Sequence, residues 1–224
     1  ATTEIYTLSL HDALPIWINF NINTSSSDSK FTMRLSGSYL INTSNLPGYD
    51  LTSFIFLPPN APDMVNPDGS LNYTNYSDNY ASYMRRPFSR TVNNLVGNAT
   101  LGYQLLPGLE IKTSLGYTNI QLAETSLRPA TSINPVQLAF FPRASDFTDN
   151  KSSSWIAEPQ ATYSYAIGPH KLSALAGLSF QSTDSKGQIL STDGYTSDNQ
   201  LLNPQAAPHI SIQNEATLYR YAAG

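Results

Sequence analysis

The chain has 224 residues, no cysteine, a net charge of −4 and only 12% charged side chains. These values exclude disulfides and thiolate metal sites, and they leave no basic run that could neutralise the phosphates of a nucleic acid. A soluble domain is usually about 25% charged, whereas a surface that faces lipid avoids charge, because Arg or Lys at mid-bilayer costs roughly 2–4 kcal/mol.

The first residues do not fit the rest of the chain. His11 and Asp12 interrupt their apolar stretch and no basic segment precedes it, which argues against a secretory signal peptide. Glu4–Ile16 resembles a translated sequencing-adapter read-through, and a short amphipathic helix is the alternative interpretation. We therefore expect 1–16 to be a non-native leader and 17–224 to be a partial fold, truncated at both ends.

Alternating apolar and polar residues predict strands along the remaining chain. In chain order these are Trp17–Thr24, Phe31–Ile41, the pair Asn94–Leu105 and Leu109–Gln121, the pair Trp155–Ile167 and Lys171–Gln181, and Glu215–Gly224. Each pair is joined by a tight turn, at Leu106-Pro107-Gly108 or at Gly168-Pro169-His170. Long polar loops are expected at Asn42–Thr91, Ala123–Ser153 and Asp184–Ile212.

The predicted strands have the length and the two faces of membrane-crossing strands. Runs of roughly 11–13 residues exceed the usual 5–6 of soluble sheets and match the 9–11 needed to cross a bilayer at a tilt. Short turns at one end and long loops at the other predict an all-β, antiparallel transmembrane β-barrel. The polar face, expected to line a wet lumen, carries Arg34, Glu110, Lys112 and Glu158.

Aromatic residues fall near the predicted strand ends. Tyr39, Tyr117, Trp155 and Phe180 lie toward the long loops, and Tyr165 lies toward a short turn. This placement favours an interfacial girdle, and the ordinary strand propensity of aromatic residues is the alternative.

Three stretches together resemble one family. They are Gly102–Ile111 (GYQLLPGLEI) running on to Gly116-Tyr117, Trp155–Glu158 continuing through His170-Lys171-Leu172 to Gly177–Gln181, and Pro58-Pro59 followed by Asn66–Ser70. In this order and spacing they resemble the SusC/RagA family of TonB-linked outer-membrane transporters over roughly residues 17–224.

The resemblance implies a fold and a function. It implies that the chain contributes about seven strands of a barrel of about 22 strands. The signal peptide, carboxypeptidase-like domain, TonB box and plug domain of the family would lie outside this sequence. The family implies import of oligosaccharides, or of peptides, through the outer membrane of Bacteroidota-type bacteria. A SusD-like surface lipoprotein would cover the long loops, and TonB with ExbB and ExbD would supply the energy.

No catalytic, cofactor or metal site is predicted. The sequence has no nucleophile elbow and no Gly-rich phosphate loop, and its three histidines have no second ligand at metal spacing. Asp63, Asn66 and Asp68 read either as a turn or as calcium ligands. Glu110 and Glu158 read as lumen-lining side chains rather than as a glycosidase pair.

One tyrosine cluster in the first long loop is a candidate substrate contact. Tyr73, Tyr76, Tyr80 and Tyr83 are interleaved with Asn72, Asn75, Asp78 and Asn79. Aromatic rings stack on sugar faces, and amides bond hydroxyl groups, which suits capture of an oligosaccharide. The alternative is a loop that packs its own tyrosines or contacts a partner.

Two other function classes remain open from the sequence. A soluble or secreted all-β carbohydrate-binding module would also alternate and carry Tyr/Asn loops, although it does not readily explain such long strands. A passive porin-type barrel would share the wall but lack a plug.

Overall fold

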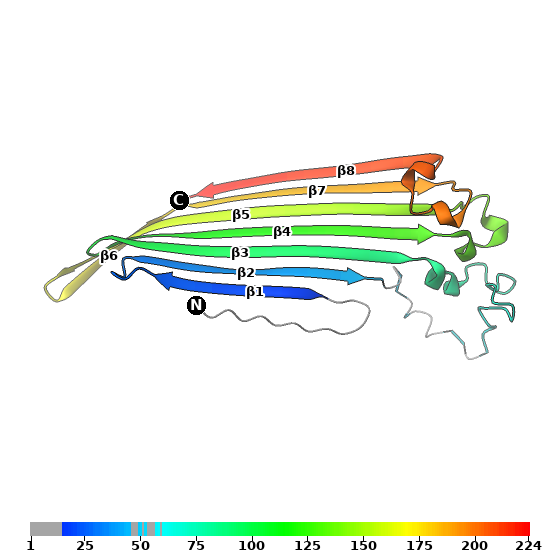
Figure 1. Cartoon of the computed structure of the whole chain (residues 1–224), viewed down its shortest axis with the longest axis horizontal. Helices are drawn as coiled ribbons and strands as arrows, with labels where there is room; N and C mark the ends of the chain where they lie inside the picture. The colour runs from blue at the N-terminus through cyan, green and yellow to red at the C-terminus, as the bar shows by residue number, and fades with distance from the viewer. Residues whose placement is uncertain (1–14, 46–48, 51, 53–56, 59) are drawn as a thin grey trace.

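The computed structural model describes residues 15–45, 49–50, 52, 57–58 and 60–224. Most of the predicted leader, residues 1–14, lies outside them, and the first strand begins at Ile16. The strands are β1 (Ile16–Ser25), β2 (Phe31–Ser44), β3 (Phe88–Leu106), β4 (Leu109–Arg128), β5 (Ala144–Ile167), β6 (His170–Gly177), β7 (Ser179–Asp193) and β8 (His209–Ala223). All belong to one antiparallel sheet (Figure 1).

The sheet is a meander in which successive strands pair, except that β6 and β7 both pair with β5. Its order is β1-β2-β3-β4-β5-β7-β8, with β6 also paired to β5, so β1 and β8 are the two edges and the sheet is not closed. Three short turns lie at one end, and the long connections lie at the other (Figure 1). The predicted antiparallel sheet with asymmetric loops is therefore confirmed.

β6 and β7 are two parts of one continuous strand. The pairs Gln160↔Gly177 and Ala157↔Phe180 belong to the same register along β5. Between them, the backbone N–H of Leu178 donates to the carbonyl of Pro159 at 2.9 Å. Proline has no N–H to return the bond, so the ladder is interrupted there. The sheet thus has seven strand positions, in agreement with the predicted number of about seven.

The strands are longer than predicted. β3, β4 and β5 have 19, 20 and 24 residues. The connections after β4 and β7 shrink to residues 129–143 and 194–208, and the connection before β3 shrinks to residues 45–87. The prediction failed because both faces become polar beyond the apolar half, which removes the alternation but leaves the backbone ladder intact. Arg90 and Glu124, for example, pair across β3 and β4 with Nε and Oε1 3.3 Å apart.

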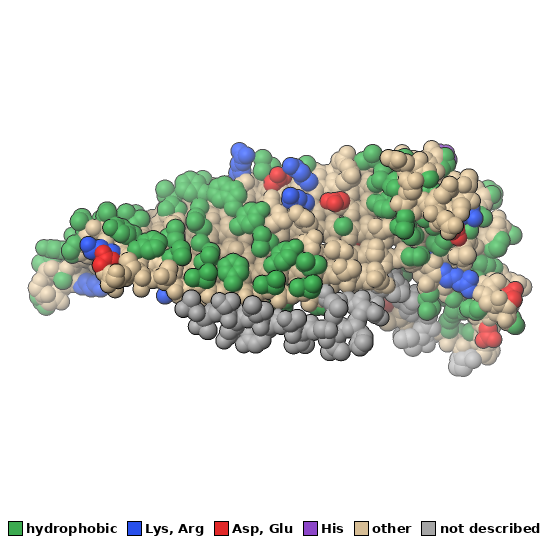
Figure 2. Space-filling model, in the orientation of Figure 1, with side chains coloured by type: hydrophobic (Ala, Val, Ile, Leu, Met, Phe, Trp, Pro, Cys, Tyr) green, Lys and Arg blue, Asp and Glu red, His purple; other side chains and the backbone are tan. Residues whose placement is uncertain are grey.

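The register defines an apolar outer face. Cross-strand partners share a face, and one row of partners runs from Phe20 through Gly37, Gly97 and Tyr117 to Trp155. Neighbouring rows add side chains such as Leu115, which is 40% exposed, and Leu172, which is 62% exposed. Figure 2 shows hydrophobic side chains gathered over the half of the molecule nearer the short turns.

The height of the apolar band fits a bilayer. Tyr165 and Trp155 bound it on β5 and lie ten residues apart. At about 3.3 Å per residue and a tilt of roughly 40°, this distance spans about 25 Å, the usual height of the apolar band of an outer-membrane barrel. Tyr165 lies near the short-turn end of β5, as predicted, whereas Tyr117 and Trp155 mark the edge of the band and not a strand end, because β4 and β5 continue past them toward the long loops.

The compact packing of the chain lies at the loop end. Among the described residues, the buried hydrophobic side chains are Leu71, Ile133, Tyr195, Leu201 and Ala207. Short 3-10 turns shape this region: η2 (Tyr80–Arg85), η3 (Ala130–Ser132), η4 (Pro135–Gln137), η5 (Asp198–Gln200) and η6 (Pro204–Ala206). No helix in the described part of the chain is long and apolar enough to cross a membrane.

Candidate functional site

The inner face of the sheet carries the predicted lumen-lining residues. One row of partners joins Arg34, Thr100, Ser114 and Glu158. Lys112 pairs with Gly102 and Gln160 in the adjacent row. The register therefore brings the predicted charged side chains to the face opposite the apolar band.

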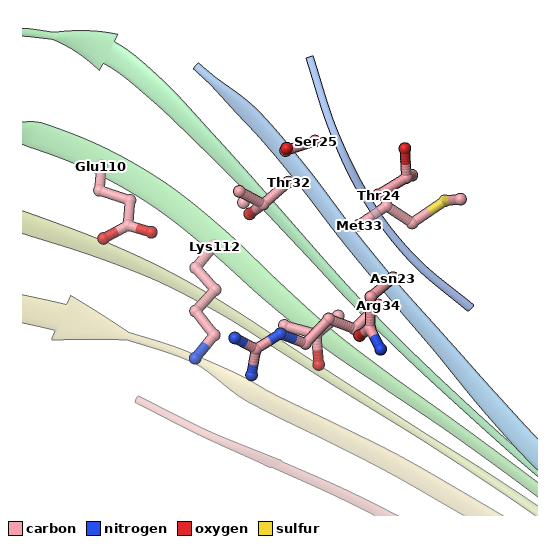
Figure 3. A pocket seen from close by; sticks show the side chains of 10 residues that line it. Asn23, Thr24, Ser25, Thr32, Met33, Arg34, Glu110 and Lys112 are labelled. Carbon is pink, nitrogen blue, oxygen red and sulfur yellow. The ribbon is translucent and has the colours of Figure 1, made fainter. Parts of the chain in front are cut away.

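A hollow of about 580 Å³ lies on this inner face near the short turns. Arg34, Glu110 and Lys112 line it, together with small polar side chains such as Thr32 and Thr100. Figure 3 shows Arg34 and Lys112 extending toward the same part of the hollow, while the Glu110 carboxylate lies apart. None of the ion pairs found among the described residues involves these three side chains. The positive charges of Arg34 and Lys112 are therefore available to an anionic group that enters the hollow.

The connection between β2 and β3 is organised by two buried asparagines. Asn79 is fully buried; its amide donates to the carbonyls of Met64 at 2.6 Å and Asn72 at 3.0 Å, and it accepts from the N–H of Ala81 at 3.0 Å. Asn72 donates to the Asp63 carbonyl at 2.8 Å. Buried amides need such partners, so these two side chains hold the loop and are not free for a ligand.

Two of the four predicted tyrosines, Tyr76 and Tyr83, form hydrogen bonds within the same loop. The hydroxyl of Tyr76 donates to the Pro62 carbonyl at 2.5 Å, and that of Tyr83 donates to Asp78 at 3.3 Å. The Tyr83 ring lies 4.4 Å from that of Tyr49, centroid to centroid. Burial raises the pKa of Tyr83, and the neighbouring Asp78 carboxylate raises it further.

Tyr73 faces a second hollow, of about 190 Å³, between this loop and the β4–β5 connection. Its hydroxyl is buried without a hydrogen-bond partner, and burial raises its pKa. Tyr80 opens η2 directly after the Asn79 cap. All four rings are partly buried. They do not form one continuous stacking platform, and their role in substrate capture stays a prediction.

Asn66 and Asp68, two of the three residues considered above as calcium ligands, bond instead within the turn at residues 66–70. Asp68 accepts from the N–H of Ser70 at 2.9 Å and from its hydroxyl at 2.6 Å, and these bonds lower the pKa of Asp68. The Asn66 amide donates to the Ser70 hydroxyl at 2.9 Å. This pattern is that of a self-bonded turn.

Sequence reasoning missed the junction that joins the other two long connections. Asp198 accepts from Arg143 Nε at 2.6 Å and from the N–H of Ala130 at 2.9 Å. Beside it, the Ser145 hydroxyl donates to the Leu201 carbonyl at 2.7 Å. These partners are 55 to 68 residues apart. No local sequence pattern predicts such pairs, because only the sheet register brings these residues together.

An apolar outer band, a polar inner face and loops of unequal length at the two ends define the class of protein. It is a wall segment of a membrane-type antiparallel β-barrel.

The comparisons with known proteins point to one kind of barrel. The TonB-dependent receptor P3 of Formosa agariphila is 25% identical over 133 residues, which cover 57% of this chain and 13% of that protein. The solved structure of the RagAB peptide transporter matches with a TM-score of 0.70 at 18% identity, over 94% of this chain and 25% of that chain. The "open-open" state of the RagAB peptide importer matches with a TM-score of 0.65 at 17% identity, over 94% of this chain and 25% of that chain. No protein-family model matches the chain.

These findings confirm the resemblance to SusC/RagA-type TonB-linked transporters. The sheet has the fold of a RagA-type barrel wall, and the chain spans about a quarter of the solved RagAB chain that it matches.

Proposed function

We propose that this chain forms part of the wall of an outer-membrane, TonB-dependent importer of oligosaccharides or peptides. The observation that carries the proposal is the apolar band of about 25 Å on one face of a sheet whose opposite face is polar. A soluble module would have to cover that band with a second layer. Among the described residues, the band contributes no buried hydrophobic side chain.

The partners follow from the same proposal. The long connections gather at one end of the sheet (Figure 1), where a SusD-like lipoprotein would sit as a lid. The solved structure with the same fold is that of the RagAB peptide transporter. TonB, ExbB and ExbD would act through a plug domain outside this chain. No bond chemistry is required of the wall, since its part is to enclose a path for the substrate.

Fractionation of cells that express the complete protein tests the membrane assignment. We expect the protein in the outer membrane, released by detergent and not by osmotic shock. Release into the soluble fraction would instead support a carbohydrate-binding module.

Uptake assays then test the mechanism. Accumulation of a labelled oligosaccharide or peptide library should depend on the complete protein and should be lost when TonB is deleted. Uptake that survives the loss of TonB would indicate a passive porin-type barrel. The component of the library that is depleted from the medium identifies the substrate class.

A further inference from the structure

The outer face carries its charged side chains in one small area. Among the described strands, the register places five charged residues on the outer face: Asp149, Lys151, Asp184, Lys186 and Arg220. They lie on three adjacent strands, β5, β7 and β8. Figure 2 shows charged side chains near the middle of the molecule's length, beyond the main hydrophobic area.

This area lies at the edge of the apolar band nearer the long loops. Arg220 lies at the same height as Trp155, because Ser182 on β7 pairs with both residues. Lys151 is four residues farther along β5, which is about 13 Å along the strand and roughly 10 Å above the band at a tilt of about 40°. The headgroup region adds roughly 5–7 Å to each side of the hydrocarbon core, and long cationic side chains reach back toward it.

Two of the cations oppose each other directly. Lys151 and Lys186 are cross-strand partners on the same face. Like charges in this position destabilise a sheet unless an anion lies between them. Asp184 lies beside Lys186, with Oδ2 3.3 Å from Nζ, but both side chains are largely exposed and no ion pair among the described residues involves Lys151. The arrangement leaves a place for one further anion.

We propose that Lys151 and Lys186, with Arg220 below them, bind the phosphate group of an outer-leaflet lipid. The inference rests on the proposed insertion of the barrel into the outer membrane. In that setting, the anion available at this height is the lipid headgroup. Lysine and arginine side chains form charge-assisted hydrogen bonds with a phosphate group, which are stronger than neutral ones.

The test uses the complete barrel protein, purified in detergent and titrated with lipid A that either keeps its phosphate groups or has lost them. We expect the wild-type protein to bind the phosphorylated lipid roughly ten- to thirty-fold more tightly, the effect expected of two lysines near an anionic surface. The double variant K151Q/K186Q should lose this preference. The charge-conserving variant K151R/K186R should keep it, as should the control Lys171→Gln, at the short-turn end of β6.

Equal binding of the two lipids by the wild-type protein would overturn the inference, and so would an unchanged preference in K151Q/K186Q. Millimolar inorganic phosphate that abolishes the preference would also count against it, because the site would then bind a free anion. Heat-modified gel mobility shows whether each variant is folded. If the protein never enters the outer membrane, the proposed function itself is wrong. If the barrel inserts into the membrane but shows no preference for the phosphorylated lipid, only this inference is wrong.

Discussion

The two glycines of the tight turns are matched in conformation but not in surroundings. Gly108 has φ +86° and Gly168 has φ +59°, both in the left-handed region that favours glycine. A Cβ on Gly108 would collide with the Ser164 carbonyl oxygen, whereas one on Gly168 would meet no atom within 4 Å. The close approach at Gly108 has a cause, because its carbonyl accepts from the N–H of Ser164 at 2.8 Å and extends the β4–β5 ladder.

Alanine substitution at these two positions separates backbone strain from crowding. Gly168→Ala should destabilise the complete barrel by about 1–2 kcal/mol through the left-handed conformation alone. Gly108→Ala should cost more, on the order of 3 kcal/mol, because the collision adds to that strain. Urea midpoints of the two variants in detergent provide the comparison, and equal midpoints would contradict the predicted contact with Ser164.

The acidic residues at the loop end provide a second matched pair. Asp198 bonds Arg143 and the N–H of Ala130, and the side chains of the ion pair are only 24% and 33% exposed for Arg143 and Asp198. Asp193 pairs with His209 at 2.8 Å, but these side chains are 46% and 74% exposed. Asp198→Ala should cost roughly 1–3 kcal/mol because two partners lose their acceptor. Asp193→Ala should cost under about 1 kcal/mol.

Hydrogen exchange of residues 194–208 is the suitable readout for this pair. We expect faster exchange in the Asp198 variant and near-native exchange in the Asp193 variant. If both variants exchange alike, Asp198 does not join the β4–β5 and β7–β8 connections in the way described above.

At the scale of the strand, the two faces of β4 predict opposite effects of an arginine substitution at neighbouring positions. Leu115 lies on the outer face between Ala99 and Ala157, while Ser114 lies on the inner face between Thr100 and Glu158. Leu115→Arg should cost roughly 2–4 kcal/mol, because the charge enters the lipid. Ser114→Arg should be nearly neutral, since it faces water and lies opposite Glu158. The yield of heat-modifiable barrel in the outer membrane measures the effect of each variant. A lower yield for Ser114→Arg than for Leu115→Arg would mean that the outer and inner faces are assigned the wrong way round.

The strands could be predicted from sequence only where the two faces differ. Between Tyr165 and Trp155 the alternation is strong, and the predicted and observed strands coincide there. Beyond the band, residues such as Arg90 and Glu124 place polar groups on the inner face while the outer face also becomes polar. The backbone ladder continues there without alternation of apolar and polar residues, so those residues were predicted to be loop.

The loops could be predicted even less well from sequence. The sequence places Asn79 among the polar side chains that would bond the hydroxyl groups of a sugar, yet it is fully buried and holds three hydrogen bonds within the loop. Its partners, Met64 and Asn72, are set by the path of the loop and by no spacing rule. The tyrosines were recognisable as a cluster, but whether each ring packs inward or outward depends on the same path.

At the scale of the whole molecule, the sheet formed by the described residues has two unpaired edges. β1 and β8 each have one neighbour, and the apolar side chains Ile18, Phe20 and Leu218 on them are 48%, 38% and 58% exposed. Unpaired backbone groups are not tolerated in lipid, and exposed apolar edges pair with other chains in water. Within a complete barrel, the neighbouring strands would satisfy both edges.

The isolated chain 17–224 should therefore not fold as a monomer. Expressed alone and refolded in water or detergent, it should sediment as aggregates or remain unfolded, while the complete barrel refolded in parallel should give a single heat-modifiable species. Light scattering and far-ultraviolet circular dichroism during a urea titration distinguish these outcomes. A soluble monomer with one sharp unfolding transition in water would mean that the apolar face is covered from within the chain, and the proposed membrane barrel would have to be abandoned. Aggregation of the isolated chain, together with folding of the complete protein, is the result that an open arc of barrel wall requires.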